Sequence, residues 1–173
     1  EKIHQLVQSK PHIDGIVITH GTATLEETAY FLNLTLKINI PVVITGAQRP
    51  ASGLSTDAAL NLVNAVRVAG SRKARGLGVL VVLNDEIQAA REVTKTSTFR
   101  LQTFRSPDFG VLGQADPDDI VFYRKPLRKH APDSVFSIDN NTKLPRVDIA
   151  YSYAGADGAA INAFVAAGAQ GIV

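Results

Sequence analysis

The 173-residue sequence contains no cysteine, and this absence limits the chemistry open to it. Without a thiol the chain forms no disulfide, no thiolate metal site and no cysteine nucleophile. The compartment stays open on this ground, because a protein without cysteine is stable in reducing and oxidising surroundings alike.

An excess of one charge and long apolar runs are missing too. Eighteen basic residues stand against 16 acidic ones, so the net charge of +2 predicts neither a nucleic-acid-binding nor a membrane-surface protein. No apolar stretch approaches the roughly 18 residues that span a bilayer. The polar, amphipathic segment 1–10 does not resemble a signal peptide, which favours a cytoplasmic location and leaves a periplasmic one open.

Short apolar runs alternate with helical patterns in the first half of the chain. The runs cover residues 15–18, 41–45 and 76–84, and the helical patterns cover residues 25–37 and 57–69. Such runs are typical of strands buried on both faces of a parallel sheet. The sequence therefore predicts an α/β fold, a parallel sheet with flanking helices.

Apolar spacing predicts which side of each helix faces the core. In the first helix we expect a buried stripe that includes Leu25 and Ala29. In the second we expect Leu60, Val63 and Val66 to point inward.

The second half of the chain predicts a different organisation. After Asn84 the pattern is polar and indicates short strands and loops. We expect a larger domain over residues 1–122, a proline-containing linker over 123–144, and the start of a second, smaller α/β domain over 145–173. A basic cluster in this linker is interpreted as solvated surface, with an acidic partner as the alternative; it contains Arg124, Lys125, Arg128, Lys129 and His130. The sequence opens with a helix and stops inside a strand that starts near Gln170, which makes us expect a longer protein.

The turn between the first strand and the first helix reads Thr19-His20-Gly21-Thr22-Ala23-Thr24. Free backbone N–H groups at a helix start favour an anion or a developing oxyanion. The Thr22 hydroxyl is a candidate nucleophile if a base lies near it. The alternative is helix capping, with Thr24 and Glu27 as a capping box. A nucleotide site is disfavoured, because neither G-x-G-x-x-G nor Gly-Lys-Ser/Thr occurs.

The next strand ends in a second loop, residues 46–55, rich in Gly, Pro and Ser. In α/β sheets ligands bind beyond the carboxyl ends of the strands, so we expect this loop and the turn 19–24 to share one crevice.

Lys95, within Val93-Thr94-Lys95-Thr96, is the candidate base. Neutralising an ordinary lysine at pH 7 costs about 4 to 5 kcal/mol, so a basic lysine needs desolvation or neighbouring positive charge. The alternative is a plain surface lysine.

Together these stretches resemble one family, the bacterial-type L-asparaginases and glutaminase-asparaginases. The resemblance rests on "DGIVITHGTATLEETAYFLNLTL", "PVVITGAQRP", "LSTDAALNLVNAV" and "AREVTKTST", which follow the family's order and spacing. It implies a flavodoxin-like N-terminal asparaginase domain that lacks its first strands, followed by the start of the C-terminal domain.

The resemblance also implies an activity and roles for named residues. The implied activity is hydrolysis of L-asparagine to L-aspartate and ammonia, with L-glutamine as a weaker substrate. Thr22 and Lys95 take the catalytic positions, and main-chain groups at Gly21 and Ala47 would contact the substrate. No metal or organic cofactor is implied, and the implied assembly is a homodimer or homotetramer without nucleic acid or membrane.

The sequence departs from the family at one site position and in its extent. Ala23 stands where the family has an aspartate that holds the substrate's α-amino group and works with the lysine. The family's G-G-T-I segment, with a second threonine, has no match. These departures leave an alternative function: a catalytically impaired asparaginase-like domain that serves as a binding or structural module.

Overall fold

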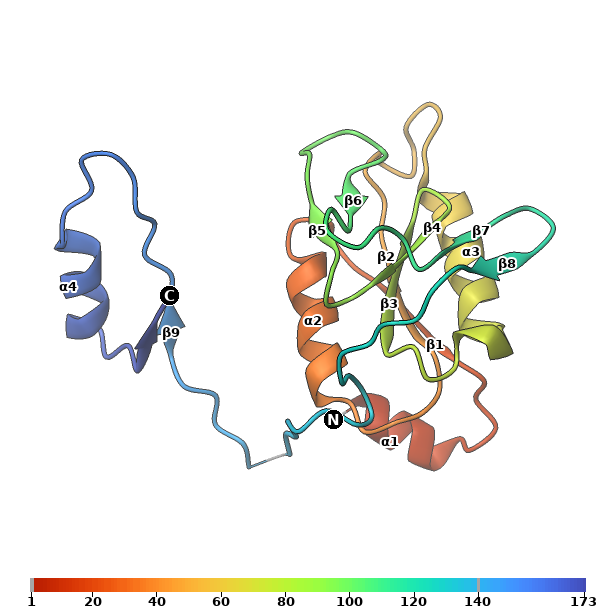
Figure 1. Cartoon of the computed structure of the whole chain (residues 1–173), viewed down its shortest axis with the longest axis horizontal. Helices are drawn as coiled ribbons and strands as arrows, with labels where there is room; N and C mark the ends of the chain where they lie inside the picture. Colours follow the sequence, from red (N-terminus) through yellow and green to blue (C-terminus); the bar gives the residue numbers. More distant parts are fainter. Residues whose placement is uncertain (1, 140) are drawn as a thin grey trace. The chain divides into compact units, whose positions relative to one another are not determined.

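The structure is a computed structural model that describes residues 2–139 and 141–173 (Figure 1). Glu1 of the first predicted helix and Asn140 of the predicted linker lie outside it. The chain divides into two compact units, the first ending at Ser137 and the second beginning at Ile138. Within the described residues, no helix combines the length and the apolar character needed to cross a membrane.

The first unit is built on a six-stranded sheet of order β1-β2-β3-β4-β7-β8. Its strands are β1 (Ile16–Thr19), β2 (Val42–Thr45), β3 (Val79–Leu83), β4 (Glu86–Ala89), β7 (Gly113–Ala115) and β8 (Ile120–Phe122). The pairs β1–β2 and β2–β3 are parallel, which confirms the predicted parallel arrangement. The pairs from β3 onward are antiparallel, so the sheet is mixed.

A tight hairpin causes the change from parallel to antiparallel pairing. Leu83 pairs with Glu86, so only Asn84 and Asp85 connect β3 to β4. Both connecting residues have positive φ, 52° and 64°. Two such residues form the turn whose twist matches that of a hairpin, and Asn and Asp tolerate this conformation better than most residues.

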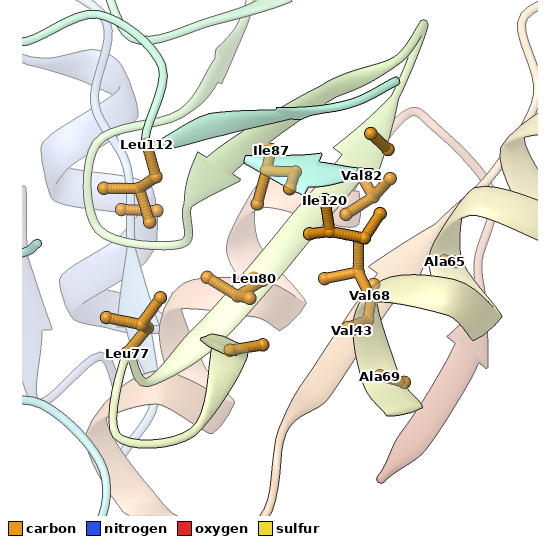
Figure 2. Packing of buried hydrophobic residues seen from close by; sticks show 13 residues of the cluster. Val43, Ala65, Val68, Ala69, Leu77, Leu80, Val82, Ile87, Leu112 and Ile120 are labelled. Atoms are coloured by element: carbon orange, nitrogen blue, oxygen red, sulfur yellow. The ribbon is translucent and has the colours of Figure 1, made fainter. Parts of the chain in front are cut away.

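Two helices cover opposite faces of the sheet, α2 (Leu25–Thr35) on one and α3 (Ala58–Gly70) on the other (Figure 1). Alternate strand residues pack against each helix, because successive side chains of a strand point to opposite faces. Val43 belongs to the core under α3, whereas Val42 and Ile44 belong to the core under α2. Figure 2 shows the first of these cores, where Val43, Leu80 and Val82 from the strands gather with side chains of α3. β2 and β3 are therefore buried on both faces, as predicted, whereas β1 lies at the edge of the sheet and its residues 16–18 are only half-buried.

The inward face predicted for α3 is wrong. Leu60, Val63 and Val66 are exposed by 55%, 54% and 56%. The buried face instead carries Ala65, Val68 and Ala69, with Asn61 and Asn64 beside them. Both faces have helical spacing, so apolar periodicity alone does not choose between them.

Hydrogen bonds decide which face of α3 is buried. The Asn61 carboxamide oxygen accepts from the backbone N–H of Asn84 at 2.9 Å. The Asn64 amide donates to Asp85 Oδ1 at 2.8 Å. These two asparagines therefore serve the β3–β4 turn, and buried polar groups are tolerated when they find such partners.

Smaller elements complete the two units. The first unit also contains α1 (Lys2–Ser9), a 3₁₀ turn η1 (Arg72–Ala74) and a separate antiparallel ribbon of β5 (Thr94–Lys95) and β6 (Phe104–Arg105). The second unit contains β9 (Val147–Asp148), α4 (Ala159–Ala166) and β10 (Gly171–Ile172), with β9 and β10 parallel. The strand–helix–strand pattern predicted after Pro145 is thus present.

The basic cluster of the predicted linker is only partly solvated. Lys125, Arg128 and Lys129 are exposed, in agreement with the surface interpretation. Arg124 instead forms an ion pair with Glu92, with 2.5 Å between Nη2 and Oε2. This pair ties the start of the predicted linker to Glu92, and both residues belong to the first unit.

Candidate active site

The turn that follows β1 is held at both sides by hydrogen bonds. The backbone N–H of His20 donates to the Thr45 carbonyl at 2.8 Å, which ties the turn to the end of β2. The His20 ring lies 2.7 Å from the Gly21 carbonyl through Nδ1 and 2.9 Å from Thr28 Oγ1 through Nε2. Because a carbonyl only accepts, Nδ1 carries a proton, and in the neutral ring Nε2 then accepts from the Thr28 hydroxyl. The ring thereby anchors the turn to α2.

Gly46, the first residue after β2, allows this turn and the next loop to approach closely. A Cβ at Gly46 would lie 2.5 Å from the His20 carbonyl oxygen. Real side chains do not occupy such a position without moving the backbone. A residue without Cβ is therefore needed where the two site loops meet.

Thr22 and Lys95, the predicted nucleophile and base, lie in direct contact. Lys95 Nζ donates to Thr22 Oγ1 at 2.8 Å, across 73 positions of sequence. Both residues are half-buried. Lys95 is consequently not a plain surface lysine, and the Thr22 hydroxyl has an amine within proton-transfer distance.

The predicted capping box at the start of α2 is wrong. Thr24 occupies the N-cap position but makes no side-chain capping hydrogen bond. Its backbone angles, φ −126° and ψ 18°, differ from the extended conformation in which a cap side chain reaches back to the helix N–H groups. Glu27, the other predicted member, is exposed.

A carboxylate that sequence reasoning missed, Glu26, holds the β5 strand next to this turn. Its Oε1 accepts from the Thr94 hydroxyl at 3.1 Å, and its Oε2 accepts from the backbone N–H of Lys95. In the sequence, Glu26 looks like an acidic residue in the first turn of a helix, where the macrodipole favours negative charge. Nothing local indicates a partner 69 positions away.

A second missed carboxylate, Asp57, shapes the loop that carries Ala47. Asp57 Oδ2 accepts from the backbone N–H of Gln48 at 2.9 Å, and Oδ1 accepts from that of Arg49 at 3.0 Å. Asn61 Nδ2 donates to Asp57 Oδ2 at 2.9 Å and to the Gly46 carbonyl at 3.0 Å. An aspartate at a helix N-cap suggests capping from sequence alone, but this side chain turns back to the loop.

These contacts set the pKa of Asp57. Partial burial by itself would raise the pKa of this carboxyl, but the hydrogen bonds from Gln48, Arg49 and Asn61 stabilise the carboxylate and outweigh it. The pKa of Asp57 is therefore lowered from 3.8. The loop is held by a negative charge that its own donors keep ionised.

The three site segments also touch each other directly. Gln48 Nε2 donates to the Arg100 carbonyl at 3.0 Å, which joins the loop after β2 to the loop between β5 and β6. With the Lys95–Thr22 contact, this places the ends of β1, β2 and β5 around one region.

Two hollows open between these segments. One, of about 420 Å³, is lined by Thr19, His20, Gly21, Thr45, Gly46, Ala47, Ala58 and Leu62. The other, of about 590 Å³, is lined by Ala23, Lys95, Thr96, Ser97 and Thr98. The expectation that the turn 19–24 and the loop 46–55 share a crevice is confirmed by the first hollow, in which both Gly21 and Ala47 lie.

The charge of the lining is simple. With histidine neutral, Lys95 is the one charged residue among those that line the two hollows. Ala23 lies beside it and supplies no carboxylate. In residues 2–139 and 141–173, no group of three or more His, Asp or Glu side chains is placed to hold a metal ion.

Comparisons with known proteins agree with the sequence motifs. A family described as "Asparaginase, N-terminal" matches residues 1–128. L-asparaginase 2 of Bacillus subtilis is 51% identical over all 173 residues, and glutaminase-asparaginase of Pseudomonas fluorescens is 47% identical over 99% of the chain. The chain covers 46% and 47% of these two proteins, so it spans about half their length.

A solved structure gives the same result for the fold. The crystal structure of a probable cytoplasmic L-asparaginase from Campylobacter jejuni matches with a TM-score of 0.94 and 44% identity. The match covers 99% of this chain and 54% of that one. The family match covers well over half of the chain, and the chain belongs to the asparaginase family.

Proposed function

We propose that this chain carries the threonine–lysine part of an L-asparaginase active site, which hydrolyses the side-chain amide of L-asparagine to L-aspartate and ammonia. The observation that carries the proposal is the 2.8 Å contact from Lys95 Nζ to Thr22 Oγ1 at the strand-to-helix turn. A nucleophile and a base in hydrogen-bond contact is the arrangement that covalent catalysis requires.

The reaction follows from this contact. In the deprotonated form that a base requires, the Lys95 amine accepts the Thr22 proton while Oγ1 attacks the amide carbon, whose oxygen becomes an oxyanion. The C–N bond breaks as the Lys95 ammonium returns its proton to nitrogen, and ammonia leaves. Water then cleaves the threonine ester, with Lys95 again taking and returning a proton, and L-aspartate is released.

Backbone groups in the other hollow, which Lys95 does not line, are proposed to bind the substrate. Gly21 and Ala47 line the hollow of about 420 Å³, where main-chain donors would meet the substrate carboxylate and the developing oxyanion. The names of the B. subtilis and P. fluorescens relatives support a small amide as substrate. We propose L-asparagine as the main substrate and L-glutamine as a weaker one.

Ala23 sets the expected level of activity. Position 23 lines the same hollow as Lys95, where the resemblance places an aspartate. Without that carboxylate the lysine has no acidic orienting partner at this position and a substrate ammonium has no anchor there. We therefore expect weak turnover in the chain and higher turnover with Ala23→Asp.

The test is ammonia release from L-asparagine by the chain and by its Ala23→Asp variant, each with and without Thr22→Val. We expect Thr22→Val to lower the release at least about 100-fold in the more active parent. If Thr22→Val leaves the rate of ammonia release unchanged, the roles assigned to Thr22 and Lys95 are wrong. Absence of release from both parents would favour the alternative, a catalytically impaired module.

Two further proposals concern organisation. We propose that residues 123–144 connect two domains, 1–122 and 145–173, which is supported by the position of the unit boundary, after Ser137, inside this segment. We also propose a homodimer or homotetramer, as the family resemblance implies. Light scattering after size exclusion tests the assembly, and a monomer at every concentration would contradict it.

A further inference from the structure

We propose that Glu26 is a positioning residue that holds Lys95 against Thr22. The inference rests on the proposed function, which assigns the catalytic role of the Thr22–Lys95 pair. The position of Lys95 beside Thr22 rests on hydrogen bonds. Glu26 does not touch the reacting atoms, so its role is exerted through Lys95.

Lys95 is bound twice, once to the turn before α2 and once to the first turn of that helix. Its amine donates to Thr22, and its backbone N–H donates to Glu26. Thr22 lies in the turn that precedes α2, and Glu26 lies in the first turn of the helix. The Glu26 carboxylate thus fixes the backbone of Lys95, and the side chain of the same residue reaches the Thr22 hydroxyl.

The β5 strand needs such a tie because it lies outside the main sheet. β5 and β6 form a separate two-residue ribbon, and short two-stranded ribbons are marginal by themselves. Val93 and Phe104 pack into the core under α2 and keep the ribbon near the sheet. Apolar packing is non-directional and does not fix the position of Lys95 along α2. The hydrogen bonds of β5 fix that position.

Both oxygens of Glu26 are used for this purpose. The second oxygen accepts from the Thr94 hydroxyl at 3.1 Å, so two successive residues of β5 are held by one side chain. Hydrogen bonds to an ionised acceptor are stronger than neutral ones. Since Ala23 supplies no carboxylate beside Lys95, Glu26 is the acidic group that orients this lysine in the described chain.

The neighbouring Glu27 provides a matched control. It lies on the same helical turn with the same charge, but it is exposed and makes no side-chain hydrogen bond within the described residues. Glu26→Gln keeps the size of the side chain, but its single acceptor oxygen cannot replace both carboxylate contacts. Comparing Glu26→Gln with Glu27→Gln therefore separates the effect of the Glu26 hydrogen bonds from the effect of losing one negative charge on this helical turn.

The first readout is structural and does not depend on activity. In the chain labelled at threonine methyl and lysine ε positions, we expect a nuclear Overhauser contact between Thr22 and Lys95. Glu26→Gln should weaken it and speed exchange of the Lys95 amide proton at least about tenfold, whereas Glu27→Gln should change neither. Unchanged contact and exchange in Glu26→Gln, or equal changes in Glu27→Gln, would overturn the inference.

Thr94→Val covers the case in which Glu26→Gln does not fold. It removes only the hydroxyl that donates to Glu26 and keeps the side-chain shape. Faster exchange of the Lys95 amide in this variant supports the tie through Glu26, and unchanged exchange contradicts it.

The second readout uses turnover in the Ala23→Asp background. There we expect Glu26→Gln to lower kcat about tenfold to a hundredfold with little change in KM, because a misplaced base slows chemistry more than binding. If Glu26→Gln weakens the nuclear Overhauser contact but Thr22→Val leaves ammonia release unchanged, the proposed function is wrong and the positioning role of Glu26 is supported. Where kcat depends on Thr22 but not on Glu26, the positioning fails alone.

Discussion

Lys95 Nζ lies 2.8 Å from Thr22 Oγ1, and the residue next to Thr22 in the chain, Ala23, lines the same hollow as Lys95. A hydroxyl and an amine are thus paired without the carboxylate that would complete a triad at position 23. Two opposing effects follow from this gap. A missing negative charge eases deprotonation of a lysine, but it also removes an orienting partner and a substrate anchor.

We expect the loss of orientation to dominate, so Ala23→Asp should raise ammonia release from L-asparagine by up to about 10⁴-fold. Ala23→Asn is the control, because it adds similar bulk without charge and should give little of this gain. Initial rates from a coupled ammonia assay measure the effect. A fully active parent that Ala23→Asp leaves unchanged would show that the triad is wrongly assigned.

Gly46→Ala should destabilise the first unit by about 1 to 3 kcal/mol, because the new Cβ would lie 2.5 Å from the His20 carbonyl oxygen. Gly21→Ala is the matched control on the other side of the same hollow, since a Cβ there meets no heavy atom within 4 Å. Its stability should stay within about 0.5 kcal/mol of the parent. Urea unfolding followed by circular dichroism compares the two, and equal losses would contradict the close approach.

Asp57→Asn should destabilise the first unit by about 1.5 to 3 kcal/mol, because one amide oxygen cannot accept all the hydrogen bonds that the carboxylate takes. Asp118→Asn is the control, an exposed aspartate without side-chain hydrogen bonds within the described chain, and should have an effect under about 0.5 kcal/mol.

The same variant predicts a pH dependence. The pKa of Asp57 is lower in the folded chain than its ordinary value of 3.8. Its contribution to stability is therefore complete above that ordinary value and is lost as the pH falls through the folded pKa. Unfolding midpoints measured at pH values on either side of 3.8 should fall less steeply for Asp57→Asn than for the parent. Parallel curves would rule out a lowered pKa.

The buried face of α3 predicts opposite outcomes for two valines two positions apart. Val68 is fully buried and Val66 is 56% exposed. Val68→Ala should cost about 2 kcal/mol through lost burial and a residual cavity, whereas Val66→Ala should change stability by less than about 0.5 kcal/mol. A larger loss from Val66→Ala in thermal unfolding would restore the face that apolar spacing predicts.

Local patterns predicted the elements well because their signals lie within one segment. The run at residues 42–44 consists of Val and Ile alone, and a strand buried on both faces of a sheet requires such a composition. The stripe containing Leu25 and Ala29 likewise indicated both the helix and its buried face. The motifs and the family resemblance point to Thr22 and Lys95, and the two side chains lie in contact in the structure.

Local sequence patterns did not predict the properties that depend on partners far along the chain. α3 carries two stripes with helical spacing, and the choice between them depends on Asn84 and Asp85, more than 20 positions away. Glu26 resembles an ordinary first-turn acid, and Asp57 an ordinary cap. Their true partners become visible only when β5 and the loop after β2 are in place.

The amino-acid order alone therefore determined the alternation of strands and helices, the family and the choice of Thr22 and Lys95 as the proposed reacting pair. Folding decided which face of α3 is buried, which carboxylates hold the loops, and that a hydroxyl and an amine 73 positions apart touch. The physical reason is range: burial periodicity acts over a few residues, whereas a hydrogen bond joins any two groups that the fold brings within about 3 Å.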